Sequence, residues 1–319
     1  MNQPQIINTD LNLRGIAVKD VNNDGLADLI VSGNLTTVTS GWKGRVLVFR
    51  QDPATHTLGA PQEYVLSTNN AGTLAIADLN NDGLPDVVVA SAGTTGGNGQ
   101  LSFLFQGVNG ALGPEVAYNA VPVAATATAG GAEIHVADMN SDGLNDIVVQ
   151  SGLTQLAVIK QVSPGIFSTT PDYYTVQTDG WPFFQSFALG DLNGDGRTDI
   201  AVAGLIGKLN IFLQDADGKL LPPQISSNYT NEVKIFDIDG DGLNDLLFLN
   251  GGNEVTILKQ TSSHTFENVQ TFFLPTKTVG GTFTHQAMSV GDVTGDGLPD
   301  IVASWSFDGI YVLPRWKSF

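Results

Sequence analysis

One nine-residue pattern recurs six times along the chain, and it constrains the fold more than any other feature of the sequence. The copies, which we call loops 1 to 6, read DVNNDGLAD (20–28), DLNNDGLPD (78–86), DMNSDGLND (138–146), DLNGDGRTD (191–199), DIDGDGLND (237–245) and DVTGDGLPD (292–300). Their first residues lie 46 to 60 positions apart. A repeat of this length has room for four short strands, which is the size of one propeller blade.

The segments around each copy have the pattern of β-strands. Loop 4 follows the alternating stretch SFALG (186–190) and precedes the apolar run IAVAG (200–204). Later in each repeat a third strand recurs, as in GRVLVFRQ (44–51), and then a fourth, as in PQEYVL (61–66). Alternation and short apolar runs bounded by Gly, Asn and Asp predict strands rather than helices.

The repeats therefore predict an all-β fold, a six-bladed β-propeller of four-stranded antiparallel blades, formed as a single domain over residues 1–319. Counting from Asp292 to the C-terminus and on from Met1 to Asp20 covers 47 positions, which fits a sixth repeat and leaves no room for a seventh. The sixth repeat ends before a fourth strand, and QPQIIN near the N-terminus resembles the fourth-strand segments. We therefore predict that residues 4–9 form a strand that completes the last blade.

Each loop concentrates oxygen atoms at alternate positions around a turn. Ca²⁺ takes six to eight oxygen ligands, commonly from a loop that curls round the ion. Side chains at positions 1, 3, 5 and 9 supply such oxygens, the carbonyl of position 7 supplies another, and glycine at position 6 allows the positive φ of a tight turn. The sequence thus predicts up to six Ca²⁺, one per blade, with these ligands: Asp20, Asn22, Asp24, Leu26, Asp28; Asp78, Asn80, Asp82, Leu84, Asp86; Asp138, Asn140, Asp142, Leu144, Asp146; Asp191, Asn193, Asp195, Arg197, Asp199; Asp237, Asp239, Asp241, Leu243, Asp245; Asp292, Thr294, Asp296, Leu298, Asp300.

Metal-free turns, helical calcium loops and magnesium sites fit the pattern less well than calcium does. Clusters of Asp, Asn and Gly also form metal-free turns. All six copies, however, keep acids at positions 1, 5 and 9, and without a cation the clustered carboxylates within each copy would repel one another. EF-hand and dockerin loops share the first half of the pattern, but an EF-hand needs glutamate at position 12. That position here holds Val31, Val89, Val149, Val202, Phe248 or Ala303. Magnesium is disfavoured because it prefers octahedral sites that retain water.

The charge of the chain excludes one class of partner and supports the cation. The formal net charge is -18, and 19 of the 32 acidic residues lie in the loops, three in each of five copies and four in the fifth. So acidic a chain is not expected to bind nucleic acid, and no apolar run approaches the length of a membrane span. Six Ca²⁺ would bring the net charge to -6. The chain has no cysteine, so a disulfide or a zinc thiolate site is excluded.

The pattern resembles the FG-GAP or VCBS repeat family of calcium-binding β-propellers, which includes integrin α-subunit heads and the Psathyrella velutina lectin. FALGDLNGDGRTDIAVAG (187–204) carries the resemblance most clearly. The resemblance implies a propeller that binds calcium in the turn between the first two strands of a blade. Those relatives have seven blades, and the FG and GAP signatures are mostly missing here, so the resemblance does not extend to the identity of a partner or a sugar.

The function is expected on the face opposite the loops, where long and varied segments join other strands. Candidate ligand-binding residues there are Trp42, Trp181, Phe183 and His285. No catalytic residue is predicted, because four scattered histidines and metal-bound carboxylates leave no acid and base pair. The sequence favours a non-catalytic, lectin-like carbohydrate-binding protein. The alternatives are an integrin-like adhesion module that binds cell-surface or matrix proteins, and an ancillary propeller of a secreted polysaccharide- or lipid-degrading enzyme.

Calcium affinity also bears on location. Flexible extracellular sites often bind Ca²⁺ with a Kd of about 10⁻⁴ to 10⁻³ M, which suits the concentrations outside a cell. The sequence therefore predicts an extracellular or cell-surface protein. Met1 is followed by the polar NQPQ, which lacks the features of a signal peptide, so a signal is expected to be absent from this chain.

Overall fold

A computed structural model describes residues 7–35, 43–91, 99–119, 132–178, 184–204, 207–250, 254–274, 286–305 and 309–313. All regular elements within these ranges are β-strands. No helix within them is long and apolar enough to cross a membrane. The chain divides into two compact units, the first made of Met1–Asp138 with Asp142–Tyr173 and the second of Met139–Ser141 with Tyr174–Phe319. The single domain over residues 1–319 stays a prediction.

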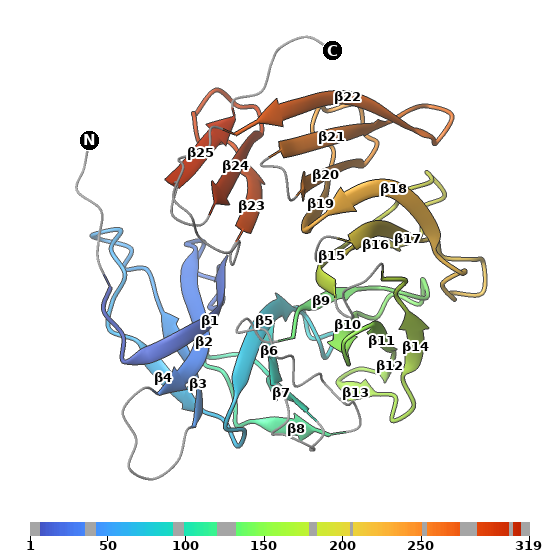
Figure 1. Cartoon of the computed structure of the whole chain (residues 1–319). Coiled ribbons are helices and arrows are strands. Elements are labelled where there is room, and N and C mark those ends of the chain that lie inside the picture. Colours follow the sequence, from blue (N-terminus) through green and yellow to red (C-terminus); the bar gives the residue numbers. More distant parts are fainter. Residues whose placement is uncertain are drawn as a thin grey trace. The chain divides into compact units, whose positions relative to one another are not determined.

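The first unit contains three antiparallel sheets, each with four strands in chain order from one edge to the other (Figure 1). Blade 1 consists of β1 (Leu11–Lys19), β2 (Asp28–Leu35), β3 (Gly44–Phe49) and β4 (Gln62–Val65). Blade 2 consists of β5 (Ala71–Ala77), β6 (Asp86–Ser91), β7 (Gln100–Leu104) and β8 (Val116–Tyr118). Blade 3 consists of β9 (Ile134–Ala137), β10 (Asp146–Ser151), β11 (Gln155–Ile159) and β14 (Asp172–Thr175), with a hairpin of β12 (Gln161–Ser163) and β13 (Ile166–Phe167) before β14.

The second unit repeats the same plan. Blade 4 consists of β15 (Phe184–Gly190), β16 (Asp199–Gly204), β17 (Gly207–Phe212) and β18 (Gln224–Thr230). Blade 5 consists of β19 (Glu232–Phe236), β20 (Asp245–Asn250), β21 (Glu254–Gln260) and β22 (Phe266–Phe273). Blade 6 consists, in the described ranges, of β23 (Gln286–Gly291), β24 (Asp300–Trp305) and β25 (Gly309–Leu313). The structure confirms the predicted all-β, six-bladed propeller fold.

The predicted closing strand at residues 4–9 is only partly covered by the described residues. Residues 4–6 lie outside them, and residues 7–9 have no assigned strand. The described part of blade 6 has three strands. The completion of this blade by the N-terminus therefore stays a prediction.

The second strand of a blade is buried because it lies inside the sheet and is covered on both faces. All six residues of β6, β10 and β16 are buried. Apolar side chains from neighbouring blades form the core between them, as where Phe103 of β7 stacks on Phe167 of the β12–β13 hairpin, with ring centroids 4.8 Å apart. Burying one such large side chain contributes about 1.5–3 kcal/mol. The apolar runs after each loop thus hold the blades together.

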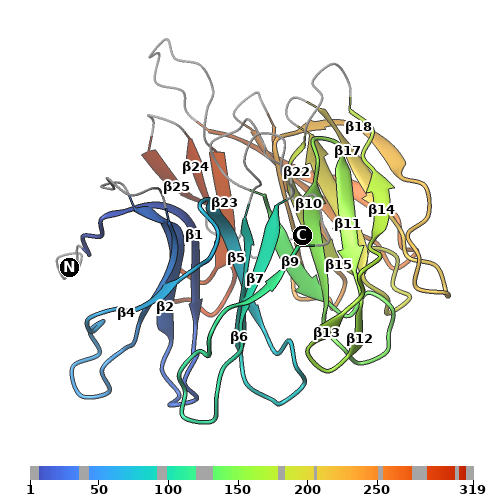
Figure 2. The ribbon, with the colours of Figure 1, turned by 90° about the horizontal axis from the view of Figure 1, so that it is seen from below.

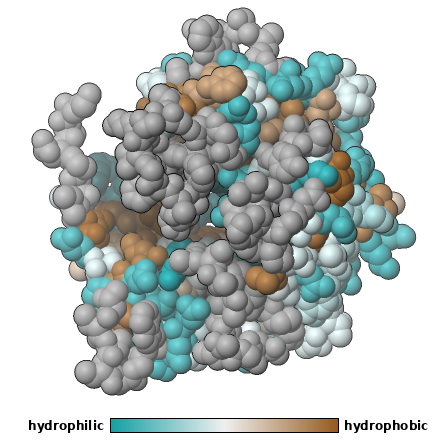
Figure 3. Space-filling model, viewed as in Figure 1, coloured by the Kyte–Doolittle hydropathy of each residue, from teal (hydrophilic) through white to brown (hydrophobic). Residues whose placement is uncertain are grey.

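Some apolar residues remain at the surface of the first strand of blade 1. Leu13, Ile16 and Val18 of β1 are 48%, 72% and 67% exposed. In the space-filling view, hydrophobic residues gather at the surface in the region of β1 (Figure 3). Leu11 at the start of the same strand is buried, so the exposed apolar side chains belong to its later part.

All six loops connect the first and second strands of their blades, as predicted from the sequence. The ninth residue of each loop is the first residue of the second strand and pairs with the last residue of the first strand, as Asp199 does with Gly190. Glycine at position 6 has a φ between 79° and 87° in the six loops, which a residue with a Cβ rarely adopts. Figure 2 shows these turns in the first unit at the lower edge of the blades, on the side of the β12–β13 hairpin.

Candidate metal centre

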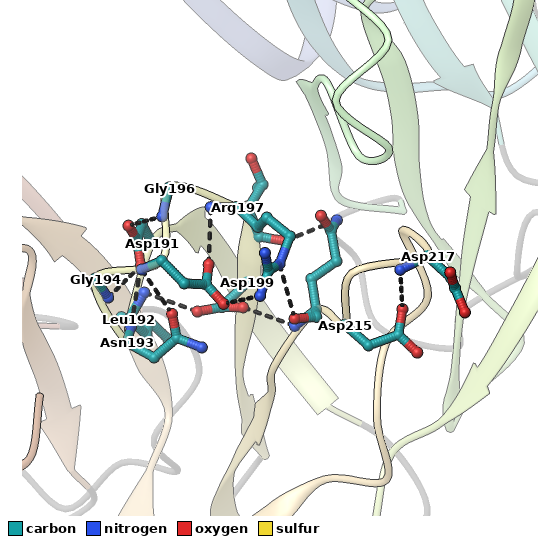
Figure 4. Close-up of polar contacts among 12 residues, drawn as sticks. Asp191, Leu192, Asn193, Gly194, Gly196, Arg197, Asp199, Asp215 and Asp217 are labelled. Carbon is teal, nitrogen blue, oxygen red and sulfur yellow. Dashed lines mark hydrogen bonds and ion pairs between the residues drawn. The ribbon is translucent and has the colours of Figure 1, made fainter.

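The first aspartate of each loop holds the turn in a curl by accepting hydrogen bonds from the backbone. In loop 4, Asp191 Oδ2 accepts from the Gly196 N–H at 2.7 Å, and Oδ1 accepts from Asn193 at 3.1 Å and Gly194 at 2.6 Å (Figure 4). The bond from the N–H of position 6 to the first carboxylate recurs in all six loops at 2.7 or 2.8 Å. Position 1 therefore draws the backbone of the turn around its own carboxylate.

Positions 3 and 5 continue this local bonding. Asn193 Oδ1 accepts from the Asp195 N–H at 3.0 Å, and Asp195 Oδ1 accepts from the Arg197 N–H at 2.9 Å. Short polar side chains that bond to the backbone two residues ahead favour turns over strands or helices. The side chains at positions 3 and 5 are thus bonded to the backbone of the turn, while their role as metal ligands stays a prediction.

The ninth aspartate has a second task that the sequence did not indicate. Asp199 Oδ2 accepts from the Leu192 N–H of the loop at 2.8 Å, while Oδ1 accepts from the Gln214 N–H after the third strand at 2.7 Å. Loops 1, 2 and 5 repeat both bonds, and all six ninth aspartates have no exposed surface. This carboxylate therefore joins the loop, the second strand and the end of the third strand.

Burial of these carboxylates changes their acidity. Burial raises the pKa of Asp86, Asp199 and Asp245 from 3.8 to about 6, against the backbone N–H groups, which lower it. In loops 2, 4 and 5 the other aspartates raise the pKa of these three residues further, because like charges disfavour ionisation. The loops thus concentrate negative charge that a bound cation would stabilise.

This acidity predicts how the stability of the metal-free protein depends on pH. The pKa values of Asp86, Asp199 and Asp245 are higher in the folded protein than in the unfolded chain, so between about pH 4 and 6 the native protein binds more protons. The free energy of unfolding therefore falls as pH rises through this window. We expect thermal melts in EDTA to show a higher Tm at pH 5 than at pH 7. The upper limit is about 3 kcal/mol for each of Asp86, Asp199 and Asp245. A metal-free Tm that rises from pH 5 to pH 7 would contradict this prediction.

Side chains of one blade also bond to the loop of the preceding blade. Gln214 Nε2 donates to the Met139 carbonyl of loop 3 at 2.6 Å, and Asn244 Nδ2 donates to the Asp191 carbonyl of loop 4 at 3.1 Å. The His264 imidazole lies so close to Gly194 of loop 4 that a Cβ there would be 1.9 Å from it. These contacts were not predicted from the sequence, although glutamine stands at or just after the end of the third strand in five of the six repeats. Loop 4 is therefore part of the boundary between blades 4 and 5.

Loop 5 differs from the others in composition and in contacts. Asp237, Asp239 and Asp245 each place one carboxylate oxygen within 4.8 Å of the others, and they form the one such acidic or histidine group found among the described residues. Asp239 stands where loops 1 to 4 have asparagine. The Lys259 ammonium forms ion pairs with Asp239 and, at 3.1 Å, with Asp241, and these bonds raise the pKa of Lys259.

The donor set of the loops fits a hard divalent cation. Carboxylate and amide oxygens at alternate positions are the ligands that Ca²⁺ prefers, and buried carboxylates with raised pKa values gain most from a bound cation. In loop 4, backbone N–H groups donate hydrogen bonds to the side chains at positions 1, 3, 5 and 9. A bound cation would supply positive charge that offsets the repulsion between these carboxylates.

The four candidate ligand-binding residues lie outside the described part of the chain. Trp42, Trp181, Phe183 and His285 all fall in segments that the structure does not describe. Their neighbour Phe184 is described, and it is buried with its ring 6.4 Å from that of Phe187 in an edge-on arrangement. Phe184 therefore packs inside its blade rather than facing solvent.

Comparison with known proteins links the repeats to one family. Residues 20–89, 78–149, 138–202 and 237–303 match the model of the FG-GAP-like repeat, and each match contains two of the loops. Human integrin alpha-IIb is 32% identical over 158 residues, which are 46% of this chain. The match covers 15% of the integrin chain, so this chain corresponds to a small part of that relative.

Solved structures share the architecture at low identity. BBS1N, crystallised in complex with ARL6DN and soaked with lead, gives a TM-score of 0.55 at 15% identity over 94% of this chain and 82% of BBS1N. Sqt1 of Saccharomyces cerevisiae gives a TM-score of 0.55 at 9% identity over 90% of this chain and 69% of Sqt1. At such identities the likeness concerns the fold alone.

Proposed function

The chain belongs to the FG-GAP-like repeat family, and on this premise we propose that it is a non-catalytic, calcium-stabilised module that binds a protein partner. The proposal that calcium stabilises the protein rests on the hydrogen bonding and burial that the six loops share. In each loop the first carboxylate accepts the N–H of position 6, and the ninth aspartate is fully buried. Oxygen ligands held in this way favour Ca²⁺ over a cation that needs nitrogen or sulfur ligands.

The similarity to integrin alpha-IIb supports a protein as the partner rather than a glycan. We place the protein outside the cell or at the cell surface, where calcium is abundant enough to fill sites with a Kd of about 10⁻⁴ to 10⁻³ M. The partner would then be a cell-surface or matrix protein. It would bind to loops carried by the rigid blades, where binding residues are commonly found.

The distribution of histidines supports a binding rather than a catalytic function. His56 follows β3, His135 lies on β9, and His264 lies between β21 and β22, so the described histidines belong to three different blades. His135 Nε2 is 3.1 Å from Glu133 Oε1, and this contact is an ion pair only when the imidazole is protonated. A general acid and base usually lie together in one pocket with the reacting group.

A binding assay in two calcium conditions tests the proposal. The full chain, immobilised through a terminal tag, would be exposed to purified matrix and cell-surface proteins in 2 mM CaCl₂ and, separately, in EDTA. We expect saturable binding to a protein that is lost in EDTA and weakened by Trp42→Ala, with Tyr173→Ala on the exposed face of β14 as the control. Binding only on a glycan array would support the lectin-like prediction instead, and turnover of polysaccharide or lipid would support the enzyme alternative.

A further inference from the structure

Lys259 and Asp239 set loop 5 apart from the other loops. Asp239 gives loop 5 a fourth carboxylate, whereas position 3 is asparagine in loops 1 to 4 and threonine in loop 6. Lys259 is the penultimate residue of β21, and its ammonium forms ion pairs with Asp239 and Asp241, the third and fifth residues of the loop. The extra negative charge thus has its own positive partner within the same blade.

The place that Lys259 occupies is the one a cation would need. Positions 3 and 5 are predicted ligands, and the Asp239 side chain is only 10% exposed, so its charge is largely removed from water. A partly buried carboxylate is costly without a counter-charge. The ammonium supplies that charge in the absence of metal.

We infer that Lys259 is a built-in competitor for calcium in loop 5, an inference that rests on the proposed calcium sites. Ca²⁺ can bind loop 5 with its full set of carboxylates only after the ammonium leaves Asp239 and Asp241. Loop 5 therefore keeps its curl without metal and fills with calcium last, at higher concentrations than loops 1 and 2. The protein then responds to calcium in steps rather than at a single concentration.

Two basic residues of other blades do not form the same pair of contacts. Lys160 follows β11 at the position that corresponds to Lys259, but its Nζ lies 3.2 Å from Asp172 Oδ2 on β14. Arg197 of loop 4 contacts one loop carboxylate, Asp195, and its Nε donates to the Gln214 carbonyl at 3.4 Å. Lys259 differs because it joins two carboxylates of one loop.

Native mass spectrometry of the full chain at stepped free Ca²⁺ concentrations tests the inference, because it counts bound ions without relying on activity. Lys259→Met keeps the length of the side chain and removes its charge, and Lys160→Met is the matched control. We expect Lys259→Met to bind one more Ca²⁺ than the wild type at intermediate concentrations, with the affinity of that site raised about tenfold or more. Lys160→Met should bind as the wild type does.

Thermal melts add a readout that does not depend on bound calcium. In EDTA, Lys259→Met should melt below the wild type because Asp239 and Asp241 lose their counter-charge. The double variant Asp239→Asn, Lys259→Met gives loop 5 the asparagine of loops 1 to 4, so it should recover metal-free stability and keep the extra calcium ion. It also provides a folded protein if the single variant does not fold.

Two results would overturn the inference, and they can be told apart. If the wild type binds calcium and neither the single nor the double variant gains an ion or affinity, Lys259 is no competitor, while the calcium sites themselves stand. If the wild type and both variants bind no calcium at any concentration tested, the proposed calcium function fails and this inference fails with it.

Discussion

Replacing Asp199 by alanine should destabilise the metal-free protein by roughly 2–5 kcal/mol. The substitution removes the acceptor for two N–H groups, those of Leu192 at 2.8 Å and Gln214 at 2.7 Å. A buried N–H left without a partner costs about 1–3 kcal/mol. Because Asp199 has no exposed surface, water cannot readily replace the lost acceptor. We expect Tm to fall by about 5–15 °C, measured by calorimetry in EDTA.

Asp217→Ala in the same blade is the matched control. Asp217 is exposed and enters the turn after β17 through its backbone N–H, which donates to Asp215 Oδ1 at 2.9 Å and is retained by alanine. The melt in EDTA separates the structural task of Asp199 from any task as a metal ligand. Equal melting temperatures of the two variants in EDTA would show that the buried carboxylate does not anchor the hairpin.

Adding calcium to the metal-free protein should raise its free energy of unfolding by about as much as Asp199→Ala lowers it. A site with a Kd of about 10⁻⁴ to 10⁻³ M gains about 0.4–1.4 kcal/mol at 1 mM Ca²⁺, so six sites would contribute roughly 2–8 kcal/mol. The stabilisation would arise because the folded loops are proposed to bind the ion and the unfolded chain is not. We expect Tm to rise by more than about 5 °C between EDTA and 1 mM Ca²⁺ at constant ionic strength.

Magnesium at the same concentration is the control for this experiment. Mg²⁺ demands near-ideal octahedral geometry and keeps several waters, so it should raise Tm by less. The gain in calcium should also be larger at pH 7 than at pH 5, because the pKa of Asp199, raised to about 6 by burial, leaves its carboxyl largely protonated at pH 5. The same Tm in EDTA and in calcium would count against bound calcium, provided that the EDTA sample is shown to be free of metal.

The blade plan could be predicted from the sequence because two periodic signals agree. The nine-residue pattern marks the turn between the first and second strands, and the recurrent segments mark the third and fourth. The segments 44–51 and 61–66, for example, contain β3 (Gly44–Phe49) and β4 (Gln62–Val65). Both signals depend on local residue types, so one sequence carries enough information to place them.

The role of Asp199 could not be predicted in the same way. The pattern shows that an acid stands at position 9, but it does not show that its two oxygens accept from Leu192 and Gln214. Gln214 lies 15 residues further along the chain, and the pairing depends on how β16 and β17 align. Contacts that depend on strand register therefore cannot be predicted from the residues of one loop.

The ion pairs of Lys259 could not be predicted from the sequence either. The third-strand segments of repeats 3 and 5 both finish with Lys and Gln in the sequence, yet Lys160 contacts Asp172 while Lys259 contacts Asp239 and Asp241. The difference follows from the acid available within reach of each lysine. The sequence contains the extra acid at position 3 of loop 5, but only the structure pairs it with Lys259.

The six aspartate loops are proposed as calcium sites, and a crystal structure of the full chain grown in calcium tests this most directly. Data collected at a long X-ray wavelength would show anomalous density from bound Ca²⁺. We expect strong peaks beside the carboxylates of positions 1 and 5, as at Asp20 and Asp24 in loop 1, and a weaker peak in loop 5, where Lys259 competes. An ordered set of loops without anomalous density, in crystals grown at 10 mM Ca²⁺, would contradict the calcium sites.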